Sequence, residues 1–193
     1  NAGARALVGR PDAGTGSVAL HFDGFRRDSG ELRVPHGADG DAGAGGRIGN
    51  SDADAGSATA GLSWVSGRGF VGLAVNRLES DYGIPLGAHA HEHDGHDDAA
   101  PEPESAHGMQ AVRIDLEQTR HELRGELEDP LPGVELLRAH LAWSDYAHDE
   151  IEHGVLGTRF GRRARDGRFE AVHRLSERLH GAAGVQFGRS DFV

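Results

Sequence analysis

Length, composition and charge already exclude several classes of protein. The chain has 193 residues, a formal net charge of −11 with histidine neutral, no cysteine, and a mean hydropathy of −0.51. Disulfides and thiolate metal sites are therefore excluded, and no apolar run reaches the ~20 residues that a membrane-spanning helix needs. The negative charge argues against binding to nucleic acid or anionic lipid and favours binding of cations.

The first half of the chain contains segments that alternate apolar and polar residues, the period-2 pattern of a strand with one apolar face. In the first of them Val18, Leu20 and Phe22 share one parity, whereas His21 and Asp23 share the other. Strands are predicted over residues 17–27, 59–65 and 70–80, after a short apolar stub at 5–8. Turns rich in glycine are predicted over residues 11–16 and 66–69.

The second half begins with a segment whose apolar parity changes. Residues 112–116 carry apolar side chains at even positions, but Leu123 and Leu127 continue at odd positions. A β-bulge near residues 119–122 would explain the change, and an amphipathic helix over 114–127 is the alternative. The β-branched start favours the strand. Further strands are predicted over residues 135–145, 158–175 (interrupted at 163–167) and around 183–187, with turns at 129–133 and 176–181.

The connections between the predicted strands alternate between short turns and long polar loops. The long loops are predicted over residues 28–57, 82–109 and 146–157. An up-and-down outer-membrane barrel has this arrangement, with short periplasmic turns and longer extracellular loops. We therefore expect an all-β fold, an antiparallel up-and-down meander that forms part of a transmembrane β-barrel with long extracellular loops. A soluble antiparallel β domain is the alternative.

The second long loop contains the most biased stretch of the chain. Within the His/acid-rich loop 83–108, four imidazoles and four carboxylates fall in residues 89–98. Imidazole nitrogen and carboxylate oxygen are ligands of Zn²⁺, and Ni²⁺ and Cu²⁺ bind the same donors. We therefore predict an exposed metal-capturing segment. Its predicted ligands, with two flanking residues included, are His89, His91, His93, His96, Asp94, Asp97, Asp98, His107 and Asp81.

Other polar residues receive weaker assignments. His21 and His140 fall on the polar, lumen-facing parity of their strands and are expected to be hydrogen-bonded inside the barrel, with a role in lining a pathway as the alternative. The acidic residues around His148 are expected to form an ordinary surface loop. No nucleophile elbow, phosphate-binding loop or His-Glu-x-x-His motif occurs in the sequence, and we therefore do not expect an enzyme.

Several short stretches follow one another in a specific order. They are GFRRD at 24–28, VP at 34–35, NSDAD at 50–54, GFVG at 69–72, ESDYGIP at 79–85, RIDLEQTR at 113–120, LRGEL at 123–127 and GTRF at 157–160. In this order, with a His/acid loop directly after ESDYGIP, they resemble the barrel of TonB-dependent outer-membrane receptors, specifically the branch associated with zinc uptake. The resemblance covers the chain from about residue 16 onward.

This resemblance implies a large barrel in the outer membrane of a Gram-negative cell, with an N-terminal plug inside it and import driven through the TonB complex. Residues 1–193 would then be a partial barrel that lacks the plug and the TonB-binding segment. The expected partners are a divalent metal ion, outer-membrane lipid and the TonB complex, which would bind through the missing N-terminal part. Nucleic acid is not expected.

Three functions remain open from the sequence. The first is part of a receptor that captures Zn²⁺ at an extracellular loop and imports it. The second is a soluble periplasmic module that binds or buffers metal. The third is a siderophore or haem receptor whose His-rich loop contacts a larger ligand.

Overall fold

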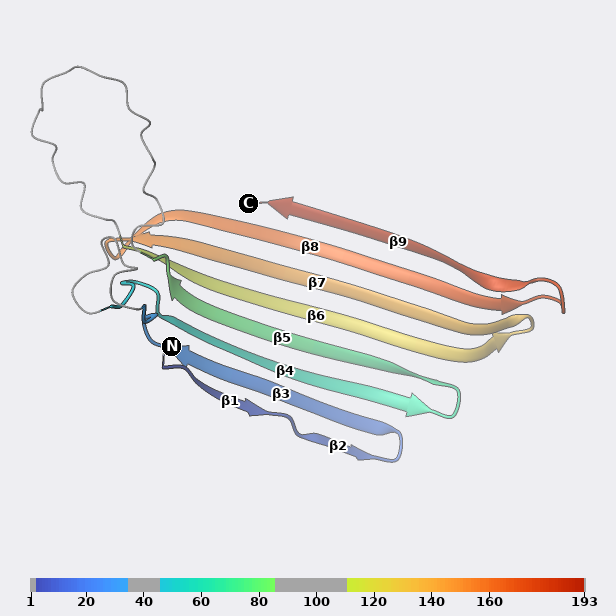
Figure 1. The fold of residues 1–193 in the computed structure, drawn as a ribbon. Coiled ribbons are helices and arrows are strands. Elements are labelled where there is room, and N and C mark those ends of the chain that lie inside the picture. The colour runs from blue at the N-terminus through green and yellow to red at the C-terminus, as the bar shows by residue number, and fades with distance from the viewer. Residues whose placement is uncertain (1–2, 35–45, 86–110, 193) are drawn as a thin grey trace, which may run out of the picture.

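The computed structural model describes residues 3–34, 46–85 and 111–192, and this part of the chain consists of strands and their connections. No helix in these ranges is long and apolar enough to cross a membrane. All strands pair antiparallel (Figure 1). They are β1 (Arg5–Gly9), β2 (Asp12–Thr15), β3 (Val18–Ser29), β4 (Ala53–Ser66), β5 (Gly69–Gly83), β6 (Val112–Leu131), β7 (Val134–Glu152), β8 (Val155–Arg174) and β9 (His180–Phe192).

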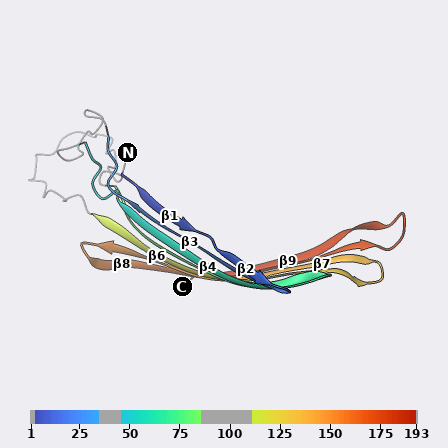
Figure 2. The ribbon, with the colours of Figure 1, turned by 90° about the horizontal axis from the view of Figure 1, so that it is seen from below.

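The strands follow one another across a single sheet in the order β1-β3-β4-β5-β6-β7-β8-β9, with β2 also paired to β3. Because Gly9 pairs with Gly24 and Asp12 pairs with His21, β1 and β2 form one interrupted strand along β3. The sheet is open, with β1 and β2 at one edge and β9 at the other. The predicted antiparallel meander is therefore confirmed, and Figure 2 shows that its long strands bend along their length.

Two predicted connections are wrong. Residues 11–16 were expected to form a turn, but β2 occupies most of that range and only Gly16 and Ser17 turn. The loop expected over 146–157 is a two-residue turn at His153 and Gly154, both with positive φ, as a tight hairpin requires. The alternation of short and long connections thus holds for two of the three connections on the loop side.

The expected bulge at residues 119–122 is also wrong. Strand β6 pairs without interruption with β5 from Arg113 to Leu127, and the shift in its register with β7 comes later, between Glu128 and Leu131. The apolar parity of β6 changes although the backbone stays regular. The side chains therefore change in polarity on both faces of the sheet part-way along the strand.

One face carries an apolar band in the half of the sheet that lies next to the short turns. Because residues directly opposite one another share a face, the partners Leu73, Leu123, Leu141, Gly167 and Phe187 form one row across β5–β9. We call this face the outer face and the opposite one the inner face. The band also includes Val18, Leu20, Phe22, Leu62, Trp64, Val71, Val75, Leu127, Leu137, Phe169 and Val185.

The apolar band is exposed rather than packed. Leu62 is 51% exposed, Leu73 56% and Phe187 52%, and the buried hydrophobic residues of the described ranges are Ile114 and Ala142. From Gly69 to Val75 the band rises about 20 Å at ~3.3 Å per residue. An outer-membrane barrel needs an apolar band about 25 Å tall. Measured along strands that tilt in such a barrel, the band is shorter than this height, but it has the exposure and apolar composition of a lipid-facing surface.

The inner face opposite this band is ionic. Glu122 accepts hydrogen bonds from Arg120 and Arg124 at 2.7 Å each, and Arg138 donates to Glu170 at 3.0 Å. His21 lies between Asp12 and Asp23, with its Nε2 2.8 Å from Asp23 Oδ2. The expectation of a hydrogen-bonded interior histidine is confirmed for His21.

His140 also lies on the inner face but is held differently. Its Nε2 is 3.6 Å from Glu122 Oε2, within ion-pair reach, and has no hydrogen-bond partner among the described residues. The expectation of a hydrogen bond is therefore wrong for His140.

Candidate functional site

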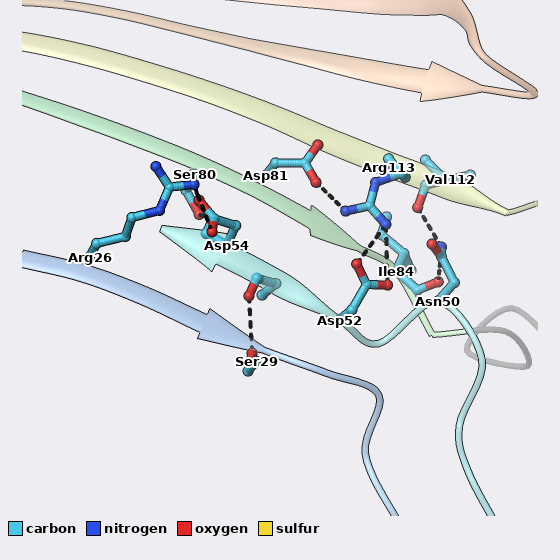
Figure 3. A network of polar contacts seen from close by, with 11 residues as sticks. Arg26, Ser29, Asn50, Asp52, Asp54, Ser80, Asp81, Ile84, Val112 and Arg113 are labelled. Atoms are coloured by element: carbon cyan, nitrogen blue, oxygen red, sulfur yellow. Dashed lines mark hydrogen bonds and ion pairs between the residues drawn. The ribbon is translucent and has the colours of Figure 1, made fainter. Parts of the chain in front are cut away.

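We call the end of the sheet at which β5 ends and β6 begins the mouth, and a polar network joins the strand ends there (Figure 3). The Asn50 side-chain amide donates to the carbonyl oxygens of Ile84 at 2.8 Å and Val112 at 2.7 Å. The Ile84 N–H donates to the same Val112 carbonyl at 2.9 Å. Ile84 precedes residues 86–110 and Val112 follows them, so one side chain joins both ends of that segment. We call these three residues the neck.

Gly83 makes the neck possible. A Cβ atom at this position would overlap both Oδ1 and the backbone oxygen of Asn50. Asn50 itself has a φ of 56°, in the left-handed region that asparagine tolerates better than most residues. The glycine of ESDYGIP is therefore required by the structure, because only glycine lets the loop before β4 approach the end of β5.

Arg113, next to the neck, pairs with two carboxylates. Its Nη1 donates to Asp52 at 3.0 and 3.2 Å, and its Nη2 donates to Asp81. The hydrogen bond to Asp81 is the main reason that the pKa of Arg113 is raised, so the guanidinium stays charged. Asp81, a predicted metal ligand, is therefore neutralised by Arg113, and a metal ion there would have to compete with that pairing.

Asp81 also belongs to a row of aspartates on the outer face. Asp28, Asp54, Asp81, Asp115 and Asp149 are successive partners across β3–β7. Like charges directly opposite one another destabilise a sheet, and arginines offset part of this cost. Arg26 donates to both oxygens of Asp54, at 3.0 and 3.1 Å. This acidic row crosses the sheet just below the point where residues 86–110 leave and return.

Asp149, at the end of the row, is paired across the β7–β8 hairpin. Arg159 Nε donates to Asp149 Oδ1 at 2.7 Å, and this pairing lowers the pKa of the Asp149 carboxyl. Residues around His148 were predicted to form an acidic surface loop, but they belong to β7 and pair with β8, with a register shift between Glu150 and Ile151. Among their carboxylates, Asp149 is matched across the hairpin by Arg159, whereas Glu150 and Glu152 face uncharged residues on both neighbouring strands.

The inner face at the mouth carries an aromatic cluster, which the sequence analysis missed. Tyr146 Oη lies 3.1 Å from His148 Nδ1, and the His148 and Phe160 rings are 5.0 Å apart. His148 Nε2 is buried without a hydrogen-bond partner in the described part of the chain, 3.6 Å from Glu150 Oε1. The spacing of Tyr146, His148 and Glu150 would have placed them on one face, had this segment been predicted as a strand.

Most of the predicted metal ligands lie outside the described residues. This applies to His89, His91, His93, His96, Asp94, Asp97, Asp98 and His107. Within residues 3–34, 46–85 and 111–192, no three histidine or carboxylate side chains are grouped to hold a metal ion. The described part of the site is thus a charged and aromatic mouth around the two ends of the His-rich segment.

Comparison with known proteins supports the fold. No protein-family model matches the chain. A solved structure, "The FrpB iron transporter from Neisseria meningitidis (F3-3 variant)", is similar with a TM-score of 0.73 over 97% of this chain, at 14% sequence identity. The chain spans 29% of that structure's length. The fold prediction, an all-β antiparallel up-and-down meander, is confirmed, and the sheet is open in the described residues.

The neck leads to a first prediction. Asn50→Asp replaces the donor amide by a carboxylate, which would face two carbonyl oxygens at less than 3 Å. We expect the exchange protection of the Ile84 amide to fall at least about tenfold, because losing two hydrogen bonds costs roughly 1–3 kcal/mol. Hydrogen–deuterium exchange at the Ile84 amide measures this protection. Asn76→Asp, which breaks a β4–β5 contact instead, should leave Ile84 protected, and equal loss in both variants would contradict the assignment.

Proposed function

We propose that this chain is part of the barrel of an outer-membrane receptor that imports zinc, with residues 86–110 capturing the ion outside the cell. The observation that supports the proposal most directly is the neck. It fixes both ends of the His-rich segment at the mouth, opposite the β4–β5 and β6–β7 turns. The rest of the receptor would supply the plug and the segment that contacts the TonB complex.

The chemistry of capture follows from the side chains. His89, His91 and His93 share one parity of an extended chain, and two or three imidazoles can bind one Zn²⁺. The acidic residues of the segment, such as Asp97, and the acidic row add a field that concentrates cations. Ni²⁺ and Cu²⁺ bind imidazole and carboxylate donors as well. Selectivity for zinc would therefore arise deeper in the receptor.

A second candidate function is import of a ferric chelate or haem. It is favoured by the aromatic cluster of Tyr146, His148 and Phe160 on the inner face, because flat aromatic surfaces suit an organic ligand. The similar structure is also described as an iron transporter. A soluble metal-buffering module is disfavoured, because the exposed apolar band would have no partner in water.

Isothermal titration calorimetry of the full-length protein in detergent tests the proposal. Replacing His89, His91, His93 and His96 by alanine should weaken Zn²⁺ binding at least tenfold. Binding should also weaken below about pH 6, since only neutral imidazole, with a usual pKa of ~6.5, binds the ion. A control variant removes His153 and His180, which lie in a turn and on the edge strand.

The outcomes separate the two candidate functions. Unchanged Zn²⁺ binding in the four-histidine variant would overturn capture by residues 86–110. Binding of haem or a ferric chelate without a measurable response to Zn²⁺ would support the second candidate instead.

A further inference from the structure

The row of side chains at the mouth-side edge of the apolar band has an unusual composition. Across β5–β9 the outer face there carries Val75, His121, Trp143, Arg165 and Arg189 as successive partners. The row below it is apolar, and the row above it, toward the mouth, contains Arg77, Asp145 and Asp191 among others. The row therefore lies where the apolar band ends, on the side away from the short turns.

Arg165 and Arg189 directly face each other in this row. Two like charges in that position repel, so the pair is costly unless an anion lies between or above them. Arg189 donates to Asp191 at 3.1 Å, whereas Arg165 has no carboxylate within ion-pair distance in the described ranges. Both guanidinium groups are exposed. One of the two positive charges, that of Arg165, is thus uncompensated among the described residues, on a chain whose net charge is −11.

An apolar hollow lies on the same face, nearer the short turns. It has a volume of about 740 Å³ and is lined by outer-face residues that include Trp64, Leu127, Leu137, Phe169 and Val185. Phe169 follows Arg165 by four residues, a distance of about 13 Å along the strand at ~3.3 Å per residue. A molecule with an anionic head at the arginines would extend its acyl chains directly into this hollow.

We propose that Arg165 and Arg189 bind a phosphate group of a lipid in the outer leaflet, with the acyl chains of that lipid in the hollow below. Guanidinium groups recognise phosphate through paired N–H donors. Trp143, beside Arg165, has the position of an aromatic residue at the membrane interface. The negative net charge of the chain disfavours anionic surfaces in general, but the local charge of this pair is positive.

Lipid titration of the full-length protein in detergent, followed by native mass spectrometry, tests the proposal. The probes are a bis-phosphorylated, acylated glucosamine disaccharide and its dephosphorylated form. The double variant Arg165→Gln with Arg189→Gln should bind the phosphorylated lipid at least tenfold more weakly than the unchanged protein. Restoring charge with lysine at both positions should recover part of the affinity. Arg77→Gln, on the same face but paired with Glu79, should leave binding unchanged.

Three results would overturn the proposal. In the first, the glutamine double variant binds the phosphorylated lipid as tightly as the unchanged protein does. The variant must also show the heat-modifiable gel shift of a folded barrel. Another is equal affinity for the dephosphorylated lipid. The third is full displacement of the lipid by millimolar inorganic phosphate, which would assign the arginines to a free anion. None of these measurements involves metal import. Their outcome therefore neither supports nor contradicts the zinc proposal.

Discussion

Leu123→Arg should reduce the free energy of unfolding in lipid vesicles by about 2–4 kcal/mol, the effect of an arginine near the midplane of a barrel's lipid face. Leu123 lies in the middle of the apolar row, between Leu73 and Leu141. A charge there would have to leave water for hydrocarbon. Equilibrium unfolding in denaturant, with the full-length protein folded into vesicles, measures the change.

The matched control for Leu123→Arg is Thr119→Arg. Thr119 is on the same strand and the same face, beyond the apolar band, between Arg77 and Asp145. We expect this variant to stay within about 0.5 kcal/mol of the unchanged protein, as most surface substitutions do. If both arginines destabilise equally, the apolar band does not end between Leu123 and Thr119.

Gly69→Ala should be the most damaging substitution in the short turns. Gly69 has a φ of 142°, which side chains rarely adopt, and an added Cβ would overlap the carbonyl oxygen of Glu126 and lie 2.8 Å from its carbonyl carbon. The β4–β5 hairpin would have to move away from β6. We expect a loss of at least about 2 kcal/mol, because backbone strain alone costs roughly 1–3 kcal/mol. Denaturant unfolding measures this loss as well.

The same turn provides the control. Gly67→Ala adds the same methyl group two residues away, where nothing lies within 4 Å. This variant should unfold like the unchanged protein. If Gly67→Ala and Gly69→Ala have equal effects, the close approach of β5 to Glu126 does not contribute to stability.

Alternation along single strands was sufficient to predict most of the sheet. Val18, Leu20 and Phe22 share a parity in the sequence, and their strand was placed correctly because the lipid-facing band is continuous there. Alternation led to a wrong prediction, a bulge in β6, where the apolar side chains change from one face of the sheet to the other. In β6, Ile114 lies on the inner face and Leu123 on the outer face, which a single strand crossing the edge of the band explains without a bulge.

Charge also misled the prediction around β7. Asp149 and its acidic neighbours appeared too polar for a strand, because their partners are distant in the sequence. Arg159 neutralises Asp149 only when the hairpin forms, and local composition carries no information about that pairing. The turn at His153 and Gly154 was the available local signal, since both residues tolerate positive φ.

The mouth could be predicted only in part. The His-rich stretch stands out by composition alone, whereas the neck joins Asn50, Ile84 and Val112 from three separate parts of the chain. The row of aspartates is likewise visible only once the register of five strands is known. Asp81 was selected from the sequence as a metal ligand, but its pairing with Arg113 could not be foreseen.

The neck has a consequence for how this protein can vary. Because Asn50 holds the two ends together, residues 86–110 close a loop whose ends stay fixed whatever lies between them. Doubling the length of a flexible closed loop costs only about 0.6 kcal/mol. Histidines and carboxylates can therefore be gained, lost or replaced in this segment at almost no cost to the sheet. The composition of this segment can therefore change while the sheet that carries it stays the same.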